Sequence, residues 1–182
     1  MNFIKLKNNL DITDYSINEE HISFGVDVNG TFKGIKYSAV DTEIKKQLFN
    51  LIPKEHQHHF DISVMQVNAT IPPHTDSNIT ATINFYIKTN NCLTQFYSLK
   101  TNSPKTHQVE NQTTGYLFAV SDLEKIDNFI AEPGELWLLN VSKPHSVHPN
   151  ISGPIDRVAL CLQSRKFNFE ETVELLRATG NL

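Results

Sequence analysis

A histidine and a carboxylate stand two residues apart at His74 and Asp76, directly after Pro72 and Pro73. Residues at i and i+2 of an extended chain point to the same side, so an imidazole and a carboxylate at this spacing can bind one ion. A His-x-Asp pair also occurs by chance in surface turns, and the pair alone does not establish a metal site. The pattern predicts a strand that ends at the two prolines and presents both side chains.

A second segment, Pro133–His148, contains a turn, a strand and a histidine at the end of that strand, His145. Arg157 then heads a final apolar strand about a dozen residues later. Two histidines and one carboxylate on one face of an octahedral ion leave three positions open, as non-haem Fe(II) requires to hold a bidentate co-substrate and then dioxygen. A permanently charged, planar guanidinium can take the distal carboxylate of a dicarboxylate in a two-pronged pairing.

With these residues the sequence resembles the Fe(II)- and 2-oxoglutarate-dependent oxygenases, and within them the aspartyl/asparaginyl β-hydroxylase-like branch. The resemblance runs from about Ser63 to Gln163. Its anchors, in chain order, are Ser63–Gln66, Ile71–Asp76, Gly134–Trp137, His145–Val147 and Arg157. The joint occurrence of these motifs in this order is more specific than any one of them.

The resemblance implies a double-stranded β-helix in which His74, Asp76 and His145 bind Fe(II). It also implies that Arg157 binds the C5 carboxylate of 2-oxoglutarate and that Ser63 helps to hold the same carboxylate. Some members of the branch have glycine in place of the acidic ligand, so the presence of Asp76 makes this chain more similar to the general three-ligand pattern.

The strand after the first two ligands departs from the branch. That strand usually offers Arg and His to the C1 end of the co-substrate, whereas Thr82, Asn84 and Tyr86 stand here on one face. The resemblance leaves open which of the three contacts 2-oxoglutarate. The Arg-x-Ser pattern of other 2-oxoglutarate enzymes is absent, because Arg157 is followed by Val158 and Ala159.

His148 is an alternative third ligand, three residues after His145. If the strand continues through Val147, positions 145 and 148 face opposite sides and cannot both reach one ion. The Lys-Pro-His-Ser-Val context matches the resembled branch and favours His145. His148 is then expected at the pocket mouth or in solvent.

Composition bounds the class of protein. The 182 residues include 39% hydrophobic and 20% charged residues, which is typical of one globular domain and excludes fibres and disordered tails. A net charge of −4 makes nucleic acid an unlikely partner. Two cysteines, no apolar leader and no run of 18 apolar residues favour a cytoplasmic protein without a membrane partner.

The remaining pattern predicts a mostly β fold with flanking helices, an antiparallel β sandwich or jelly roll, as one domain over 1–182 with its core at about 60–165. Within this class the resemblance implies a cupin-like double-stranded β-helix. One helix is expected from Asp41 to Pro53, and another from an Asn168/Glu171 capping box to Gly180. A weaker capping box predicts a short helix from Ser121. The expected strands are Ile62–Val67, Ala81–Ile87, Thr94–Tyr97, Gly115–Val120, Leu136–Leu139 and Arg157–Gln163.

Other chemistry-bearing residues have structural interpretations. His56, His58 and His59 are expected in a solvated loop, and Cys161 in the core of the last strand. Cys92 is expected in an exposed turn. Trp137 is expected in the jelly-roll core, and Asn140 either orients a ligand or closes a turn.

The sequence therefore predicts a dioxygenase that uses Fe(II), 2-oxoglutarate and dioxygen to hydroxylate a C–H bond. The resemblance implies an Asp- or Asn-like side chain, or another amino-acid side chain, in a protein or in a free amino acid. Substrate-facing loops are expected around Asn90 to His107 and in the N-terminal region. The alternative is a cupin-type metal-binding protein that acts as a sensor, isomerase or hydrolase. The oligomeric state is not predicted.

Overall fold

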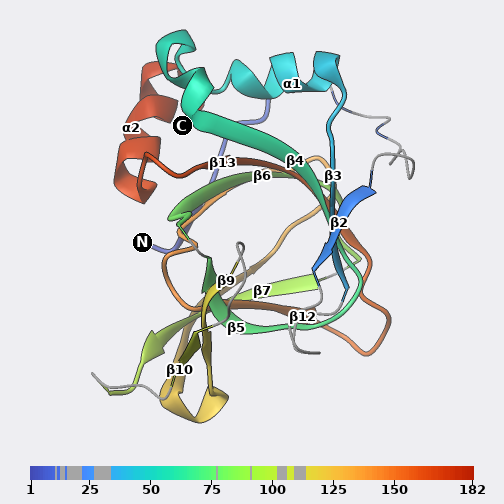
Figure 1. Cartoon of the computed structure of the whole chain (residues 1–182), viewed down its shortest axis with the longest axis vertical. Coiled ribbons are helices and arrows are strands. Elements are labelled where there is room, and N and C mark those ends of the chain that lie inside the picture. The colour runs from blue at the N-terminus through green and yellow to red at the C-terminus, as the bar shows by residue number, and fades with distance from the viewer. Residues whose placement is uncertain are drawn as a thin grey trace.

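Two antiparallel β-sheets face each other in the computed structural model (Figure 1). It describes residues 1–10, 12, 15, 22–26, 34–76, 78–90, 92–101, 106–108 and 114–182. The larger sheet has the order β1 (Phe3–Lys5), β11 (Leu136–Leu139), β6 (Ala81–Lys88), β13 (Arg157–Ser164), β4 (Phe60–Val67), β3 (Ile35–Ser38) and β2 (Ile22–Val26). The smaller sheet has the order β10 (Leu123–Ile130), β7 (Cys92–Leu99), β12 (His145–Pro149), β5 (Ile71–Asp76), β9 (Thr114–Phe118) and β8 (Thr106–Gln108). This is the predicted double-stranded β-helix of jelly-roll type.

Alternation along the central strands divides the larger sheet into two faces. In β6, Ile83 and Phe85 belong to the apolar cluster beneath the helices, whereas Thr82 and Asn84 line a pocket between the sheets. Strand β13 alternates in the same way, with Leu160 on the helix side. Because side chains in a strand alternate between faces, one strand both supports the helices and furnishes a polar cavity.

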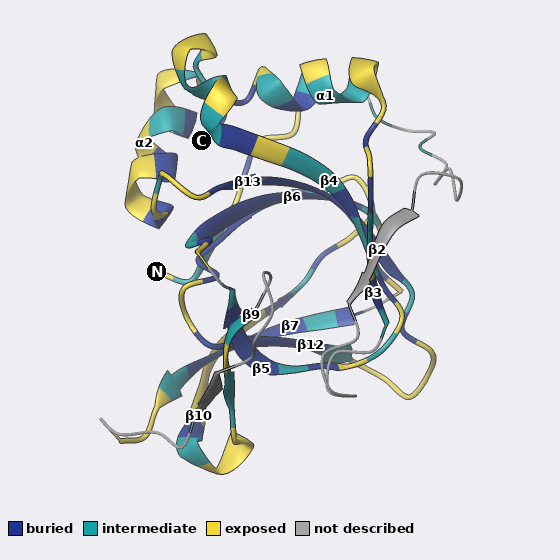
Figure 2. Cartoon of the chain, viewed as in Figure 1, coloured by how far each residue is buried: buried dark blue, intermediate teal, exposed yellow. Residues whose placement is uncertain are grey.

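The two long helices cover the outer face of the larger sheet (Figures 1 and 2). Helix α1 (Thr42–Phe49) begins at Asp41, whose side chain accepts a hydrogen bond from the Glu43 amide. Helix α2 (Phe169–Ala178) begins with the predicted capping box, in which Asn168 and Glu171 satisfy each other's backbone N–H groups. Both predicted helices are therefore confirmed at their starts.

Two local expectations were wrong. The segment after Ser121 contains only a 3₁₀ turn, Val120–Asp122, because the chain continues directly into β10, which pairs along its length with β7. Cys92 is 2% exposed rather than lying in an exposed turn, because it begins β7 and packs with Val67 and Ile71. The histidine-rich segment, expected as a solvated loop, forms the 3₁₀ helix Lys54–His59. None of its residues is fully buried.

Strand β5 contains the two prolines instead of ending at them. It pairs with β12 and β9, and the register between β5 and β12 shifts between the pairs His145↔His74 and Val147↔Ile71. Proline has no N–H to donate to a ladder and is accommodated where a bulge interrupts the pairing. The irregular pairing thus explains how Pro72 and Pro73 stay within a strand.

All six predicted strands are present, with ends moved by one or a few residues. Within the described ranges, no helix is both long and apolar enough to cross a bilayer.

Leu160→Ala is expected to lower the free energy of unfolding by about 2–5 kcal/mol, because Leu160 is fully buried between α2 and the neighbouring strands and the change leaves a cavity. Urea unfolding followed by circular dichroism measures the loss. Ile151→Ala, at a position 65% exposed, is the control and should change stability by less than about 0.5 kcal/mol. Equal losses in the two variants would contradict this account of the core.

Candidate metal centre and anion pocket

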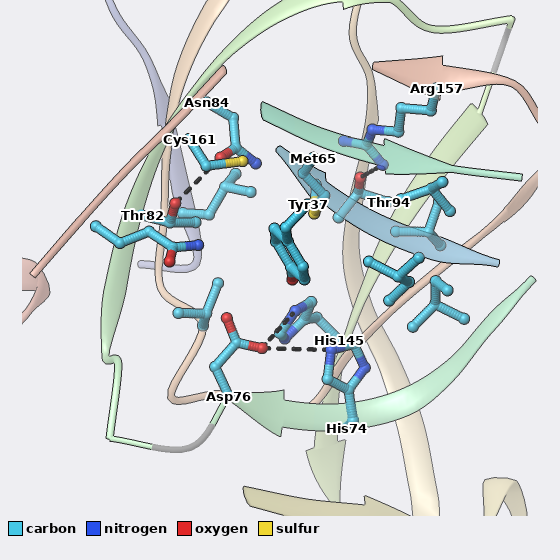
Figure 3. Close-up of a pocket in the computed structure, with 17 residues that line it drawn as sticks. Tyr37, Met65, His74, Asp76, Thr82, Asn84, Thr94, His145, Arg157 and Cys161 are labelled. Carbon is cyan, nitrogen blue, oxygen red and sulfur yellow. Dashed lines mark hydrogen bonds and ion pairs between the residues drawn. The ribbon is translucent and has the colours of Figure 1, made fainter. Parts of the chain in front are cut away.

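Three side chains bring their ligand atoms together between the sheets (Figure 3). The Nε2 atom of His74 lies 3.3 Å from Oδ1 of Asp76, and the Nε2 atom of His145 lies 3.9 Å from the same oxygen. One ligand atom from each residue falls within 4.8 Å of the other two. A first-row divalent ion with ligands at about 2.1 Å separates neighbouring octahedral ligands by roughly 3 Å, so small side-chain rotations would close this set around an ion.

The pairing of β5 with β12 positions the two imidazoles. His74 and His145 are direct cross-strand partners, and their ring centroids lie 4.3 Å apart. Asp76 joins them from two residues further along β5. The ring of Phe96, a buried residue of β7, stacks on His145 with 5.7 Å between centroids and limits its rotation.

Backbone carbonyls orient both rings. Nδ1 of His74 lies 2.9 Å from the carbonyl oxygen of Pro72, and Nδ1 of His145 lies 3.0 Å from that of Lys143. A carbonyl oxygen only accepts, so each Nδ1 carries the proton and donates it. In the neutral ring the lone pair is then on Nε2, the atom that faces Asp76, and this tautomer is the one that binds metal ions.

Burial keeps His145 neutral. It lowers the pKa of His145 to about 4, and the nearby His74 and Arg157 add to the lowering, while Asp76 and the Lys143 carbonyl oppose it. A neutral imidazole is the form that coordinates a metal ion.

Arg157 brings a buried positive charge into the same pocket. It is 2% exposed, and no carboxylate among the described residues lies within ion-pair distance of it. Its Nη1 donates to Thr94 Oγ1 at 2.9 Å, its Nη2 donates to the Tyr86 hydroxyl, and its Cζ lies 4.5 Å from the Tyr86 ring centroid. Nε is buried and has no hydrogen-bond partner among the described residues. A buried charge is costly unless it is paired, so the geometry suits an anion that enters the pocket.

A chain of polar side chains continues from Arg157 along the inner face of β6. Thr82 donates to Asn84 at 3.1 Å, and Asn84 lies 3.4 Å from the Tyr86 hydroxyl. Gln163 of β13 is the register partner of Thr82. Thr82, Asn84 and Tyr86 therefore share one face of β6, as predicted. Thr82 and Asn84 line the pocket, whereas the Tyr86 hydroxyl accepts a hydrogen bond from Arg157.

The structure brings six of the eight predicted site residues to the pocket wall. These six are His74, Asp76, Thr82, Asn84, His145 and Arg157. Tyr86 lies behind the wall, fully buried, where it holds Arg157. Ser63 stands opposite Cys161 in the β4–β13 pairing and is not among the lining residues.

The structure also shows where the residues lie whose roles the sequence left open. His148 is absent from the pocket lining, whereas His145 and Val147 line it, in keeping with strand alternation. Asn140 accepts a hydrogen bond from the Ser142 hydroxyl, and its carbonyl accepts from the Lys143 amide, so it closes the turn before β12. In the loop expected to face substrate, residues 91 and 102–105 lie outside the described residues, as do most of positions 11–33.

Sequence reasoning missed four lining residues that matter chemically: Tyr37, Met65, Thr94 and Gln163. No motif assigns a role to any of the four, so only the pairing of distant strands reveals their place at the pocket. Met65 lies within the Ser63–Gln66 motif but had no role assigned to it. Burial raises the pKa of Cys161, another lining residue, to about 12, so this side chain stays a neutral thiol.

No protein-family model matches the sequence, and no curated protein matches it. Solved structures do resemble the fold. The epimerase SnoN, solved in complex with Fe3+, alpha ketoglutarate and nogalamycin RO, is 11% identical with a TM-score of 0.50, and the match covers 90% of this chain and 79% of that one. This likeness is to a fold and, at such identity, to nothing finer.

Two further matches are more remote. The E. coli protein ycfD is 12% identical with a TM-score of 0.43, and the match covers 95% of this chain and 44% of that one. Vicilin from Corylus avellana (hazelnut) is 11% identical with a TM-score of 0.39, over 72% of this chain and 28% of that one. The chain thus spans less than half the length of either protein.

The metal-free protein is expected to lose stability as the pH falls from about 6.5 towards 4. The pKa of His145 is about 4 in the folded state and roughly 6.5 in the unfolded state, so the unfolded chain binds the proton first. This one group contributes a slope of up to about 1.4 kcal/mol per pH unit within that window. Urea unfolding with a chelator at pH 7, 6 and 5 measures it.

His145→Gln provides the control, since it removes the titrating ring. Its stability should fall less steeply over the same pH range than that of the unsubstituted protein. Parallel pH profiles would show that His145 does not carry the dependence.

Proposed function

We propose that this protein is an Fe(II)- and 2-oxoglutarate-dependent dioxygenase that hydroxylates a C–H bond. The observation that carries the proposal concerns Arg157. It is buried, forms an ion pair with no carboxylate of the described residues, and shares a cavity with the ligand cluster of His74, Asp76 and His145. A set of metal-binding side chains alone would fit many cupin-like proteins. The added guanidinium selects a ligand that is anionic at a distance from the metal.

The wall between these two groups is apolar. Val147 and Ile71 are cross-strand partners next to the histidine pair, and Val67 is the register partner of Arg157. These three residues belong to one apolar cluster with Ile35, and all four line the pocket. A ligand with a chelating oxo acid at one end, a short methylene chain and a carboxylate at the other end matches this order of metal, apolar wall and guanidinium, and 2-oxoglutarate has that order.

Under this proposal, different pocket residues would bind the metal ion and the co-substrate. His74, Asp76 and His145 would hold the iron, which supplies the activation of dioxygen coupled to oxidation of 2-oxoglutarate to succinate and carbon dioxide. Arg157 would bind the C5 carboxylate, held in position by Tyr86 and Thr94. Burial of the cluster excludes bulk water from the reacting centre.

Within this class, the motifs in Ser63–Arg157 favour the aspartyl/asparaginyl β-hydroxylase-like branch. The substrate would then be an Asp- or Asn-like or other amino-acid side chain, in a protein or as a free amino acid. The Fe3+ and alpha ketoglutarate bound by SnoN, a protein of similar fold, agree with the cofactor assignment. Ser63 keeps its proposed role only if its hydroxyl reaches the ligand from beyond the present pocket wall.

Succinate release tests the proposal. The protein with Fe(II), 2-oxoglutarate and air, supplied with a panel of free amino acids and peptides, should form succinate, and His74→Ala should abolish its formation. Arg157→Gln should raise the KM for 2-oxoglutarate by about 30-fold or more, because it removes a buried charge pairing worth at least about 2 kcal/mol. Mass spectrometry quantifies succinate.

Arg165→Gln is the matched control, since Arg165 is exposed and lies just after β13. It should leave the KM unchanged. If the unsubstituted protein binds Fe(II) but releases no succinate with any compound, and 2-oxoglutarate does not raise its melting temperature, the oxygenase assignment fails and a metal-binding cupin without this chemistry remains.

Tyr86→Phe is expected to weaken 2-oxoglutarate binding by about 10-fold while keeping the ring beneath the guanidinium. The change removes the hydroxyl that accepts from Arg157, a net contribution of about 1.5 kcal/mol for a hydrogen bond to a charged group. Calorimetric titration of the Fe(II) protein without oxygen measures the dissociation constant. An unchanged constant would mean that Thr94 and the strand alone suffice to orient Arg157.

A further inference from the structure

Tyr37 places a phenol hydroxyl over the metal cluster (Figure 3). It comes from β3, where it pairs in register with Met65 of β4, and its ring packs against the apolar cluster of Ile35 and Val67. Figure 3 shows the hydroxyl end directed towards His145 and Asp76 rather than towards Arg157. Tyr37 therefore belongs to the metal end of the pocket.

The strand geometry makes this placement a consequence of alternation. Ile35 and Tyr37, two residues apart on β3, both line the pocket, while Lys36 between them is exposed. Sliding β3 by one residue would turn the phenol outward, so the register with β4 fixes it over the cluster.

The hydroxyl is a donor with no acceptor among the described residues. None of these residues forms a hydrogen bond with it, although Asp76 is near enough for its charge, together with burial, to raise the pKa of Tyr37. A phenol is protonated at neutral pH even without such a shift. The Tyr37 side chain is half-buried and lines the pocket, so its hydroxyl is available to an acceptor that enters the pocket.

We propose that Tyr37 is a second co-substrate-binding residue beside Arg157, and that its hydroxyl donates a hydrogen bond to the carboxylate at the metal-chelating end of an oxo acid. The inference rests on the proposed metal site and deepens it. Arg157 and Tyr37 then bind opposite ends of one ligand.

Two ligands, oxalate and 2-oxoglutarate, distinguish binding at the metal-chelating end from binding at the tail. Oxalate chelates a metal ion through two carboxylate oxygens and has no tail, whereas 2-oxoglutarate has both ends. Tyr37→Phe should weaken both ligands by a similar factor, about 10-fold to 100-fold, since a hydrogen bond to a charged acceptor contributes that much to binding. Arg157→Gln should weaken 2-oxoglutarate and leave oxalate nearly unchanged.

The experiment is calorimetric titration of each ligand into the Fe(II)-loaded protein under nitrogen. Tyr116→Phe, on the exposed surface of β9, is the matched control and should bind both ligands like the unsubstituted protein. Melting temperatures of the metal-free variants are measured alongside. A ligand-free melting temperature for Tyr37→Phe close to that of Tyr116→Phe separates lost binding from lost structure.

Each outcome decides the proposal. Unchanged affinity in Tyr37→Phe for both ligands overturns it, and so does a loss confined to 2-oxoglutarate, which would place Tyr37 at the tail. If the unsubstituted protein binds oxalate but not 2-oxoglutarate, the proposed function fails while the oxalate comparison still tests Tyr37. Failure of the iron-loaded protein to bind oxalate at all overturns the role assigned to Tyr37.

Discussion

The unpaired charge of Arg157 is the constraint around which the cavity is built. A guanidinium stays protonated at every pH at which a protein folds, so its burial cannot be relieved by losing the charge. Thr94 and Tyr86 accept two of its hydrogen bonds, but both are neutral, and the part of the chain that the structure describes offers Nε no partner. Neutral acceptors reduce the cost of desolvation without balancing the charge. The folded protein therefore carries a site whose free energy improves when an anion enters.

Much of the site was predictable from local patterns, because strand alternation needs no knowledge of the partner strand. Period-two spacing put His74 with Asp76 on one side of β5 and Thr82 with Asn84 on one side of β6, and the structure agrees with both. The caps of α1 and α2 were predictable for the same reason, since a capping box involves only neighbours in sequence. Arg157 stood out as the charged residue at the start of an apolar strand.

What escaped prediction depends on which strands pair and in what register. Nothing in the segment Ile35–Ser38 distinguishes Tyr37 from a core tyrosine until β3 is placed beside β4. The pairing of His74 with His145 depends on an irregular register at the two prolines, and bulges of this kind have no local signal. The sequence left open which of Thr82, Asn84 and Tyr86 contacts the co-substrate, and no local pattern indicated that the Tyr86 hydroxyl accepts a hydrogen bond from Arg157.

The two charged groups of the pocket explain why the proposed iron and 2-oxoglutarate would depend on each other. Among the described lining residues, Asp76 is the one acidic side chain and Arg157 the one basic side chain besides the histidines, and burial lowers the pKa of His145. The charges of Asp76 and Arg157 sum to zero. A divalent ion alone would leave two positive charges in this cavity between the sheets, and a doubly charged diacid alone would leave two negative ones. Both states are costly at low dielectric, whereas the two ligands together restore neutrality. Under the proposed function, the cavity would therefore favour joint occupancy by the ion and the diacid.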